Sequence, residues 1–366
     1  MKFIAGARLL SSPKHNDKGS SMSVKNHLSI LAAASAFSLL ATASSWAEGS
    51  LSIYAWADSI APEAVAKFEK ETGIKVTVDA FSSNEDLLTK LQAGSSGYDI
   101  VTPSQHFVKI MIDSGLLEDI GASSMPAFQQ ILPEWQKQWW DPTGNYSVPL
   151  AYGNAGFTVN RNLYKGPVDS WKVYFEPSEE LKGKIASLAQ PDEVIPAAQN
   201  YLGIPYCSED PKEMKRVLDL LQAQKPFVAA YSSDNIENRI GGGEVAMHFW
   251  WDGNTMRVRR NDKANVEYAM PKEGLVGWLD SYVVPKGAAN LDNAKKFIDF
   301  MAKEENATIE YNYYGHSSPV KVDASKALYN KENAPELFPT APVKMGQACS
   351  PAAQELVTKV WTQLLQ

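Results

Sequence analysis

The sequence predicts an α/β fold in which parallel strands alternate with helices. The segments 51–56, 74–78 and 98–102 have the apolar pattern of strands, and the amphipathic segments 62–71 and 84–93 lie between them. A β-α-β-α-β order of this kind forms a parallel sheet with helices on both faces. Ligands of such sheets bind at the carboxyl ends of the strands.

Local signals place the ends of these elements. Pro62 suits the first turn of a helix, Asn84 suits the N-cap of the next helix, and Gly94 suits its end. A second alternating region follows, with a strand-like segment over 146–160, helices over 192–202 and 212–224, and a strand over 244–250. We find neither an internal repeat nor a low-complexity linker.

Residues 1–47 are predicted to be a leader and signal peptide. The apolar stretch 28–43 follows Lys25, and Ser45-Trp46-Ala47 has the small-x-small form of a signal-peptidase site. The mature chain is therefore expected to begin at residue 48, and Met22 is an alternative translation start. The apolar core is short for a membrane span, and no later segment is long and apolar enough to be one. We expect an exported, soluble product.

The mature chain is large and acidic. It has 319 of the 366 residues, which is enough for two ordinary lobes. Removal of the leader takes away five basic residues and one acid, leaving 30 basic and 41 acidic residues and a net charge of −11. This charge argues against nucleic acid as a partner, because no basic excess is present to neutralise phosphates.

Two cysteines, Cys207 and Cys349, lie 142 positions apart. In an exported chain they either form a disulfide or remain buried and inert, and sequence distance does not decide between these outcomes. No close-spaced Cys/His pattern indicates zinc, so we expect neither a metal nor a cofactor.

An aromatic residue stands just before an acid three times, at Trp56-Ala57-Asp58, Trp251-Asp252 and Trp278-Leu279-Asp280. On a strand, residues i and i+2 face the same side, so the first and third pairs would each present an indole beside a carboxylate. Indole faces attract ammonium groups and carboxylates accept their hydrogen bonds, which suits an organic cation. The alternative is that the tryptophans belong to the core and the aspartates to turns or caps.

Six segments in order resemble the bacterial periplasmic polyamine-binding proteins, which are the spermidine and putrescine receptors of ABC importers. They are Ile53-Tyr-Ala-Trp56, Phe68-Glu-Lys-Glu-Thr-Gly-Ile-Lys-Val76, Tyr98-Asp-Ile-Val-Thr-Pro-Ser104, Asn200-Tyr-Leu-Gly203, Met270-Pro-Lys-Glu-Gly274 and Trp278-Leu-Asp-Ser-Tyr-Val-Val-Pro285. The resemblance covers nearly all of 50–366. It implies a two-lobed periplasmic binding protein fold with a hinge, a ligand cleft between the lobes, and an inner-membrane ABC permease as partner.

The resemblance also implies a set of ligand-binding residues. They are Trp56, Ser59, Ser104, His106, Glu193, Ser233, Trp251, Asp252, Trp278, Asp280, His316 and Gln347, and the strand alternation adds Asp58. Ser59, His106 and His316 stand where the family usually places cleft tyrosines. The ligand is therefore expected to be a small cationic amine that differs in length or shape from putrescine and spermidine.

The expected lobes interleave along the chain. Lobe 1 comprises 48–155 plus 274–322, and lobe 2 comprises 156–273 plus 323–366, with hinges near 155, 273 and 322. At least two crossings should join the lobes, and a single continuous sheet would contradict this arrangement. The protein is expected to be a periplasmic monomer.

Several of these residues have simpler explanations. Glu193 could be an exposed acid in the first turn of a helix, where the helix dipole favours negative charge. Asp252 before Gly253 could form a turn, and His106 and His316 could be surface or packing residues. The run 241–243 is a turn rather than a phosphate loop, because no Lys-Ser/Thr follows it.

Two other functions would use some of the same residues. An iron(III) receptor could use the neighbouring phenol oxygens of Tyr311, Tyr313 and Tyr314. A secreted enzyme could use Glu193, Asp252 and Asp280 as acid and base, although no nucleophile or metal motif accompanies them. The iron receptor leaves the three aromatic-acid pairs unexplained, and binding alone needs the same acids as the enzyme, so we expect a receptor without catalytic residues.

Overall fold

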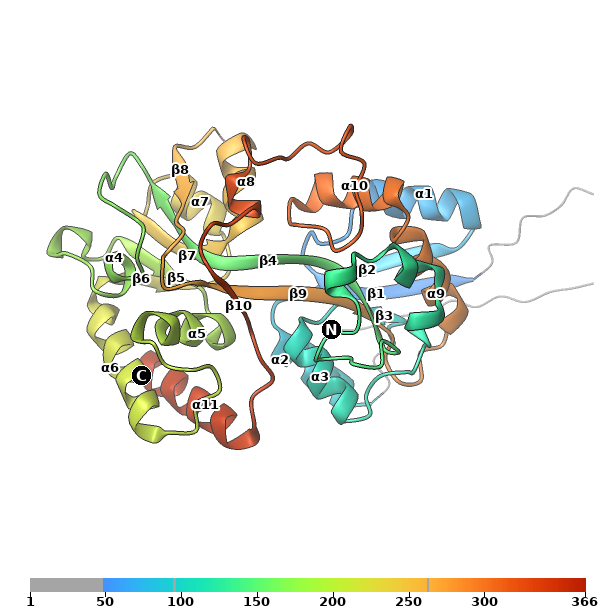
Figure 1. Cartoon of the computed structure of the whole chain (residues 1–366), viewed down its shortest axis with the longest axis horizontal. Coiled ribbons are helices and arrows are strands. Elements are labelled where there is room, and N and C mark those ends of the chain that lie inside the picture. The colour runs from blue at the N-terminus through green and yellow to red at the C-terminus, as the bar shows by residue number, and fades with distance from the viewer. Residues whose placement is uncertain (1–48, 95–96, 262) are drawn as a thin grey trace, which may run out of the picture. The chain divides into compact units, whose positions relative to one another are not determined.

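Two long antiparallel strands, β4 (Ser147–Asn160) and β9 (Leu275–Val283), run through the middle of the protein and join its two halves (Figure 1). The computed structural model describes residues 49–366 except 95–96 and 262, and these residues belong to one compact unit. The predicted leader 1–47, the mature start at 48 and Met22 lie outside the described residues. Within that range, no helix is long and apolar enough to cross a membrane.

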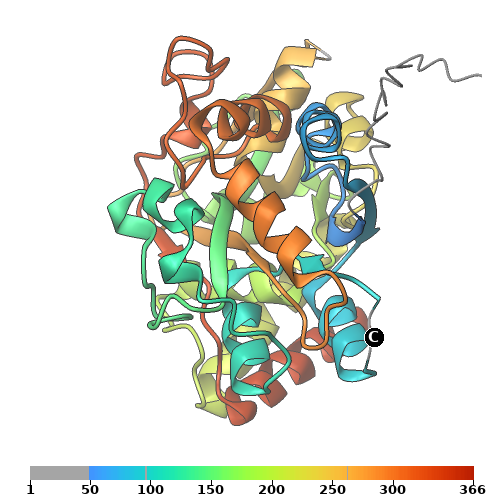
Figure 2. The same cartoon turned by 90° about the vertical axis from the view of Figure 1, so that its right-hand side faces the viewer.

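The first half contains the predicted parallel strands β1 (Ser50–Trp56), β2 (Lys75–Phe81) and β3 (Ile100–Val101), with β1 in the centre. Alternate residues of β1 are buried on one face, against α1 (Pro62–Thr72), α9 (Leu291–Met301) and α10 (Glu304–Tyr314). The opposite face packs on α2 (Asn84–Gln92) and α3 (Gln105–Asp113). Figure 2 views this half end-on and shows α9 lying across it beside α1.

The second half is built on the other end of β4. Here β4 pairs with β7 (Met247–Trp251) and β8 (Val266–Tyr268), and β5 (Ile185–Ser187) and β6 (Val228–Tyr231) extend the sheet beyond β7. Its helices are α4 (Lys172–Phe175), α5 (Pro191–Leu202), α6 (Pro211–Gln224), α7 (Ile236–Gly241), α8 (Asp252–Asn261) and α11 (Pro351–Leu365). The predicted α/β class is therefore confirmed.

The expectation of separate sheets is wrong. Among the described residues the strands form one hydrogen-bonded path, β2-β1-β3-β9-β4-β7-β5-β6, with β10 (Val343–Met345) beside β9 and β8 beside β4. The reason is that β4 and β9 are long enough to serve both halves. At Ala155, β4 pairs with Val276 of β9 on one side and with Trp251 of β7 on the other.

The two halves nevertheless have separate cores. In β4, Val148, Leu150 and Ala151 belong to the core of the first half, whereas Ala155, Phe157 and Val159 belong to that of the second. In β9, Val276 belongs to the core of the second half and Trp278 to that of the first. The strands therefore pass from one core to the other near residues 152–155 and 277. The exact domain bounds and the hinge positions stay predictions.

A disulfide joins Cys207 to Cys349, with the Cα atoms 5.0 Å apart. The bridge therefore forms, and the alternative of two buried, inert thiols is wrong. It ties the loop after α5 to the residues just before α11, the last helix of the second half. Because it closes a loop across 142 positions, it removes much conformational freedom from the unfolded chain.

Replacing both cysteines by serine is expected to lower the free energy of unfolding by about 2 to 4 kcal/mol. Urea unfolding followed by tryptophan fluorescence measures this loss. Reduced wild-type protein is the matched control and should unfold at the same urea concentration as the double variant. An unchanged midpoint in both would show that the bridge does not stabilise the fold.

Candidate functional site

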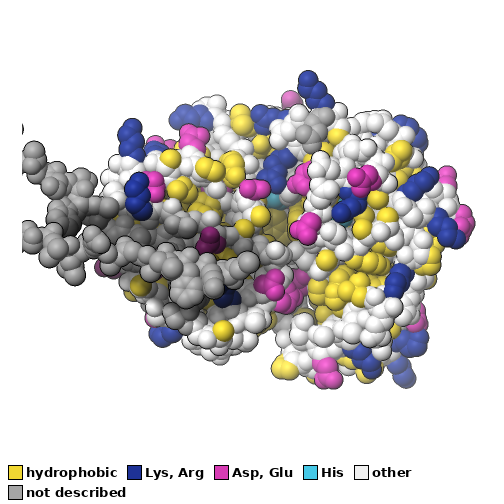
Figure 3. Space-filling view, turned by 180° about the vertical axis from the view of Figure 1, so that it is seen from behind, with side chains coloured by type: hydrophobic (Ala, Val, Ile, Leu, Met, Phe, Trp, Pro, Cys, Tyr) yellow, Lys and Arg dark blue, Asp and Glu magenta, His cyan; other side chains and the backbone are white. Residues whose placement is uncertain are grey.

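A cleft of ≈ 200 Å³ lies between the two halves and is lined by residues from both. Nine of the thirteen predicted site residues line it, namely Trp56, Ser104, His106, Glu193, Ser233, Trp251, Trp278, Asp280 and His316. In the space-filling view from behind, acidic side chains and a histidine gather where the surface is hollowed between the halves (Figure 3).

Asp280 is held at the centre of β9 by the start of α3. Its Oδ1 accepts a hydrogen bond of 2.7 Å from the hydroxyl of Ser104, which also receives a bond from the amide of Asn84. Burial raises the pKa of Asp280 to about 7, although Ser104, Trp56 and His106 act in the opposite direction. A buried carboxyl of this kind favours a cationic partner, because an ammonium group would stabilise its charged form.

The indoles of Trp56 and Trp278 lie near Asp280. The ring N–H of Trp56 interacts with the Asp280 carboxylate and lowers its pKa, whereas the buried ring N–H of Trp278 has no hydrogen-bond partner among the described residues. Trp278 packs edge-to-face on His316 with ring centroids 4.9 Å apart. As predicted, Trp278 and Asp280 lie on the same strand and both line the cleft.

Glu193 approaches the cleft from the second half, in the first turn of α5. Both of its carboxylate oxygens accept from the indole N–H of Trp251, at 2.8 and 3.0 Å. Burial, and next the neighbouring Asp192, raise the pKa of Glu193 well above its usual range. The simpler explanation of an exposed helix-start acid is therefore wrong, because only 9 % of Glu193 is exposed.

A contact across the cleft joins the two halves. The Nε2 atom of His106 lies 3.2 Å from the carboxylate of Asp192, so α3 of the first half meets the start of α5. His106 is thus a site-lining residue rather than a free surface histidine.

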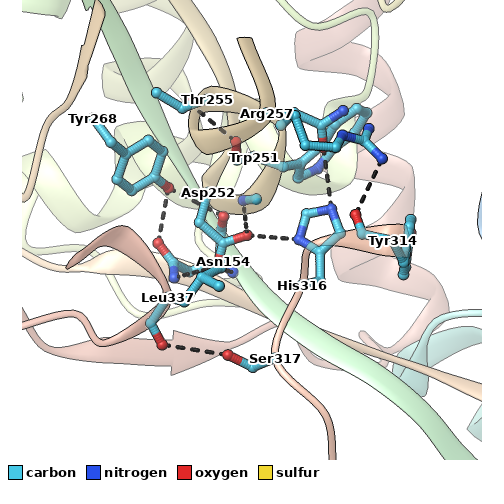
Figure 4. A network of polar contacts seen from close by, with 12 residues as sticks. Asn154, Trp251, Asp252, Thr255, Arg257, Tyr268, Tyr314, His316, Ser317 and Leu337 are labelled. Atoms are coloured by element: carbon cyan, nitrogen blue, oxygen red, sulfur yellow. Dashed lines mark hydrogen bonds and ion pairs between the residues drawn. The ribbon is translucent and has the colours of Figure 1, made fainter. Parts of the chain in front are cut away.

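Asp252 belongs to a buried polar network and does not line the cleft (Figure 4). Its carboxylate accepts from the backbone and side-chain amides of Asn154 at 3.0 and 2.8 Å, and from Gly253 N at 2.7 Å. It also lies 2.8 Å from Nδ1 of His316. Asp252 is fully buried, and these contacts leave no surface for a ligand. It positions His316, whose ring does line the cleft.

Burial lowers the pKa of His316, although its hydrogen bond to Asp252 opposes this shift. The Nδ1 atom faces a carboxylate oxygen of Asp252, and the Nε2 atom lies 3.1 Å from the side-chain oxygen Oδ1 of Asn254. Both ring nitrogens are therefore occupied by protein groups.

Three more predicted residues lie outside the cleft lining. Asp58 follows the end of β1, where a backbone φ of 55° turns it to the exposed surface, so the alternation of the strand does not extend to it. Ser59 is buried and its hydroxyl donates to the carbonyl of Trp56. Gln347 is exposed beside the disulfide, and its carbonyl faces the two sulfur atoms.

Sequence reasoning missed several lining residues, including Asn84, Asp192, Asn254, Arg257 and Tyr314. Asn84 was expected to cap α2, but Ser83 is the cap and Asn84 binds Ser104 instead. Helical spacing could have indicated Arg257, since it lies three residues after Asn254 on α8.

The iron alternative receives no support. Among the described residues, no group of three or more His, Cys, Asp or Glu side chains could hold a metal ion. Burial raises the pKa of Tyr311 to about 12, and it also raises that of Tyr314, which disfavours the phenolate form that binds iron.

A two-lobed α/β protein with a polar, aromatic cleft between the lobes has the architecture of a solute receptor. Residues 63–338 match the family described as bacterial extracellular solute-binding protein. The chain belongs to this family, and the predicted two-lobed fold is confirmed.

Relatives with known names agree with the predicted resemblance. The chain is 32 % identical over 307 residues to the spermidine/putrescine-binding periplasmic protein 1 of Haemophilus influenzae, covering 83 % of this chain and 84 % of that protein. It is 30 % identical over 337 residues to the putrescine-binding periplasmic protein SpuD of Pseudomonas aeruginosa, covering 86 % and 91 %. A solved structure, a putative spermidine/putrescine ABC transporter from Listeria monocytogenes, superimposes with a TM-score of 0.79 at 29 % identity, covering 87 % and 99 %.

Proposed function

We propose that this protein is a periplasmic receptor that binds a polyamine or related organic cation and delivers it to an ABC permease. The observation that best supports the proposal is the pairing of two buried carboxyls, Asp280 and Glu193, with the indoles of Trp56, Trp251 and Trp278 in one cleft. The names of the relatives support the same class of ligand and the same compartment.

The chemistry of this cleft suits an alkylammonium group. Indole faces attract ammonium charge and also pack against methylene groups. Burying a carboxylate or an ammonium group alone costs desolvation free energy. When the two bind each other, their attraction offsets this cost, so each is more stable in the pair than alone. Asp280 and Glu193 approach from different halves, and an amine between them is bound by both.

The two halves are expected to close around the ligand, because each half contributes one of the two acids. A ligand that touches both halves makes its full set of contacts only in the closed form, so it shifts the population toward that form. The closed complex is then the form that the permease recognises. The receptor is proposed to act as a monomer and to use its acids for binding rather than catalysis.

A thermal-shift screen tests the proposal. Putrescine, spermidine, choline, amino acids and iron(III) are each added to the purified mature chain, because a ligand specific for the folded state raises the melting temperature. Amines are expected to raise it in a concentration-dependent manner. A response to iron(III) without any response to amines would contradict the proposal.

A further inference from the structure

The polar groups of the cleft are unevenly distributed. Asp280, with Ser104 and His106 beside it, forms an acidic region that also includes Glu193. Arg257 and Asn254 line the cleft on the side of His316 and Tyr314. The charges of Asp280 and Arg257 act on Tyr314 in opposite directions, since Asp280 raises the pKa of Tyr314 and Arg257 lowers it.

Asp252, which begins the same helix as Arg257, is not free to bind a second amine. Asp252, which the resemblance implied as a ligand-binding acid, is fully buried and already bound by Asn154, Gly253 and His316. Figure 4 shows its carboxylate between Asn154 and His316, with the guanidinium of Arg257 beyond His316. A ligand group that reaches this helix therefore meets Arg257 rather than Asp252.

Arg257 has donors to spare. Its Nη1 atom donates to the carbonyl of Tyr314 at 3.0 Å, near the end of α10. This bond is explained by the capping of that helix, but it uses only one of the five N–H groups of a guanidinium. Among the described residues no acid forms an ion pair with Arg257, whereas Arg259 on the same helix pairs with Glu336 at 2.8 Å. An unpaired guanidinium in a cleft favours an anionic oxygen ligand.

We infer that the ligand has an amine at one end only and a carboxylate at the other, so that it is an ω-amino carboxylate rather than a diamine. This inference rests on the proposed function, since Asp280 and Glu193 bind the amine. Arg257 binds the carboxylate and is the specificity-determining residue. A second ammonium in its place would face a like charge, which weakens binding.

Calorimetry with matched ligands tests the inference. The series contains the four-, five- and six-carbon α,ω-diamines, the ω-amino carboxylates of the same lengths, and the corresponding amino alcohols. At the best chain length the amino carboxylate is expected to bind at least tenfold more tightly than the diamine. The amino alcohol should fall between them, because its hydroxyl accepts a hydrogen bond without a full charge.

Substitutions in α8 test whether Arg257 causes the preference for an amino carboxylate over a diamine. Arg257→Gln is expected to remove the preference by weakening the amino carboxylate at least tenfold, without weakening the diamine. Arg257→Lys keeps the charge and should keep part of the preference, which separates recognition from misfolding. Arg260→Gln is the matched control, because Arg260 is exposed on the same helix and should leave both affinities unchanged.

The possible results separate this inference from the proposed function. If a diamine binds more tightly than every amino carboxylate, or if Arg257→Gln leaves the preference intact, the inference is overturned while amine recognition stands. If no ligand of the series binds to wild-type protein, amine recognition itself fails and the inference fails with it.

Discussion

Asp280→Asn is expected to weaken the binding of an amine ligand by about 2 to 5 kcal/mol, or roughly 30- to 5,000-fold. The substitution keeps the shape of the side chain and its bond from Ser104, but it removes the charge that faces the ligand ammonium. Much of the loss arises because the ligand charge remains buried without a counter-ion. Calorimetry at pH 8, where the wild-type carboxyl is ionised, measures the difference.

Asp58→Asn is the matched control for this experiment. Asp58 also stands two residues after a tryptophan, but it is exposed and does not line the cleft. Its substitution should leave the affinity within a factor of about two, as for other exposed sites. Equal affinities in wild type and Asp280→Asn would show that Asp280 has only a structural role.

The affinity for an amine is expected to rise with pH between about 5 and 7 and to level off above that range. Burial raises the pKa of Asp280 to about 7, so below this pH the empty receptor contains a protonated carboxyl that must lose its proton to bind an ammonium. The raised pKa of Glu193 acts in the same direction. The increase should approach tenfold per pH unit for each proton released.

Proton release provides an independent measurement of this effect. At pH 6 the observed binding enthalpy should vary with the ionisation enthalpy of the buffer, and Asp280→Asn should reduce that dependence. An affinity that stays constant from pH 5 to 8 would contradict the assignment of Asp280 as the amine-binding acid.

The same pKa also affects the stability of the ligand-free protein. Since the folded-state pKa of Asp280 lies above its ordinary value of 3.8, the folded state binds more protons than the unfolded state between about pH 4 and 7. This group therefore makes the free energy of unfolding fall as pH rises through that window, with no further change above it. An amine ligand should reverse the loss by stabilising the carboxylate.

Local sequence signals predicted the first half of the fold well. The observed β1 and α1 differ from the expected ranges 51–56 and 62–71 by one residue at one end. The agreement is close because the signals that set these ends, namely strand alternation, Pro62 and Gly73, depend only on neighbouring residues. The continuous sheet was not predictable in this way. In β4 almost every residue is buried, so its pattern does not reveal that the strand changes partner at Ala155.

In the site, too, local signals predicted residues within one strand but did not predict long-range contacts. Trp278 and Asp280 were predicted together because both lie inside β9, where i and i+2 face the same side. The corresponding inference for Asp58 failed because β1 ends at Trp56. Asp252 could not be assigned from sequence, since the partners that enclose it include Asn154 and His316, which lie 98 and 64 positions away.

The position of β9 between β3 and β4 has a consequence for how the chain folds during synthesis. Strands β1 to β3 are complete by Val101, but the neighbour that covers the edge of β3 begins only at Leu275. Until then β3 has an unpaired edge, and such edges associate readily with other chains. The second half needs the same late segment and also α11, which ends at Leu365. The first half is therefore complete only after α10 ends at Tyr314, and the second only after α11, so the nascent chain exposes an unpaired strand edge for much of its synthesis.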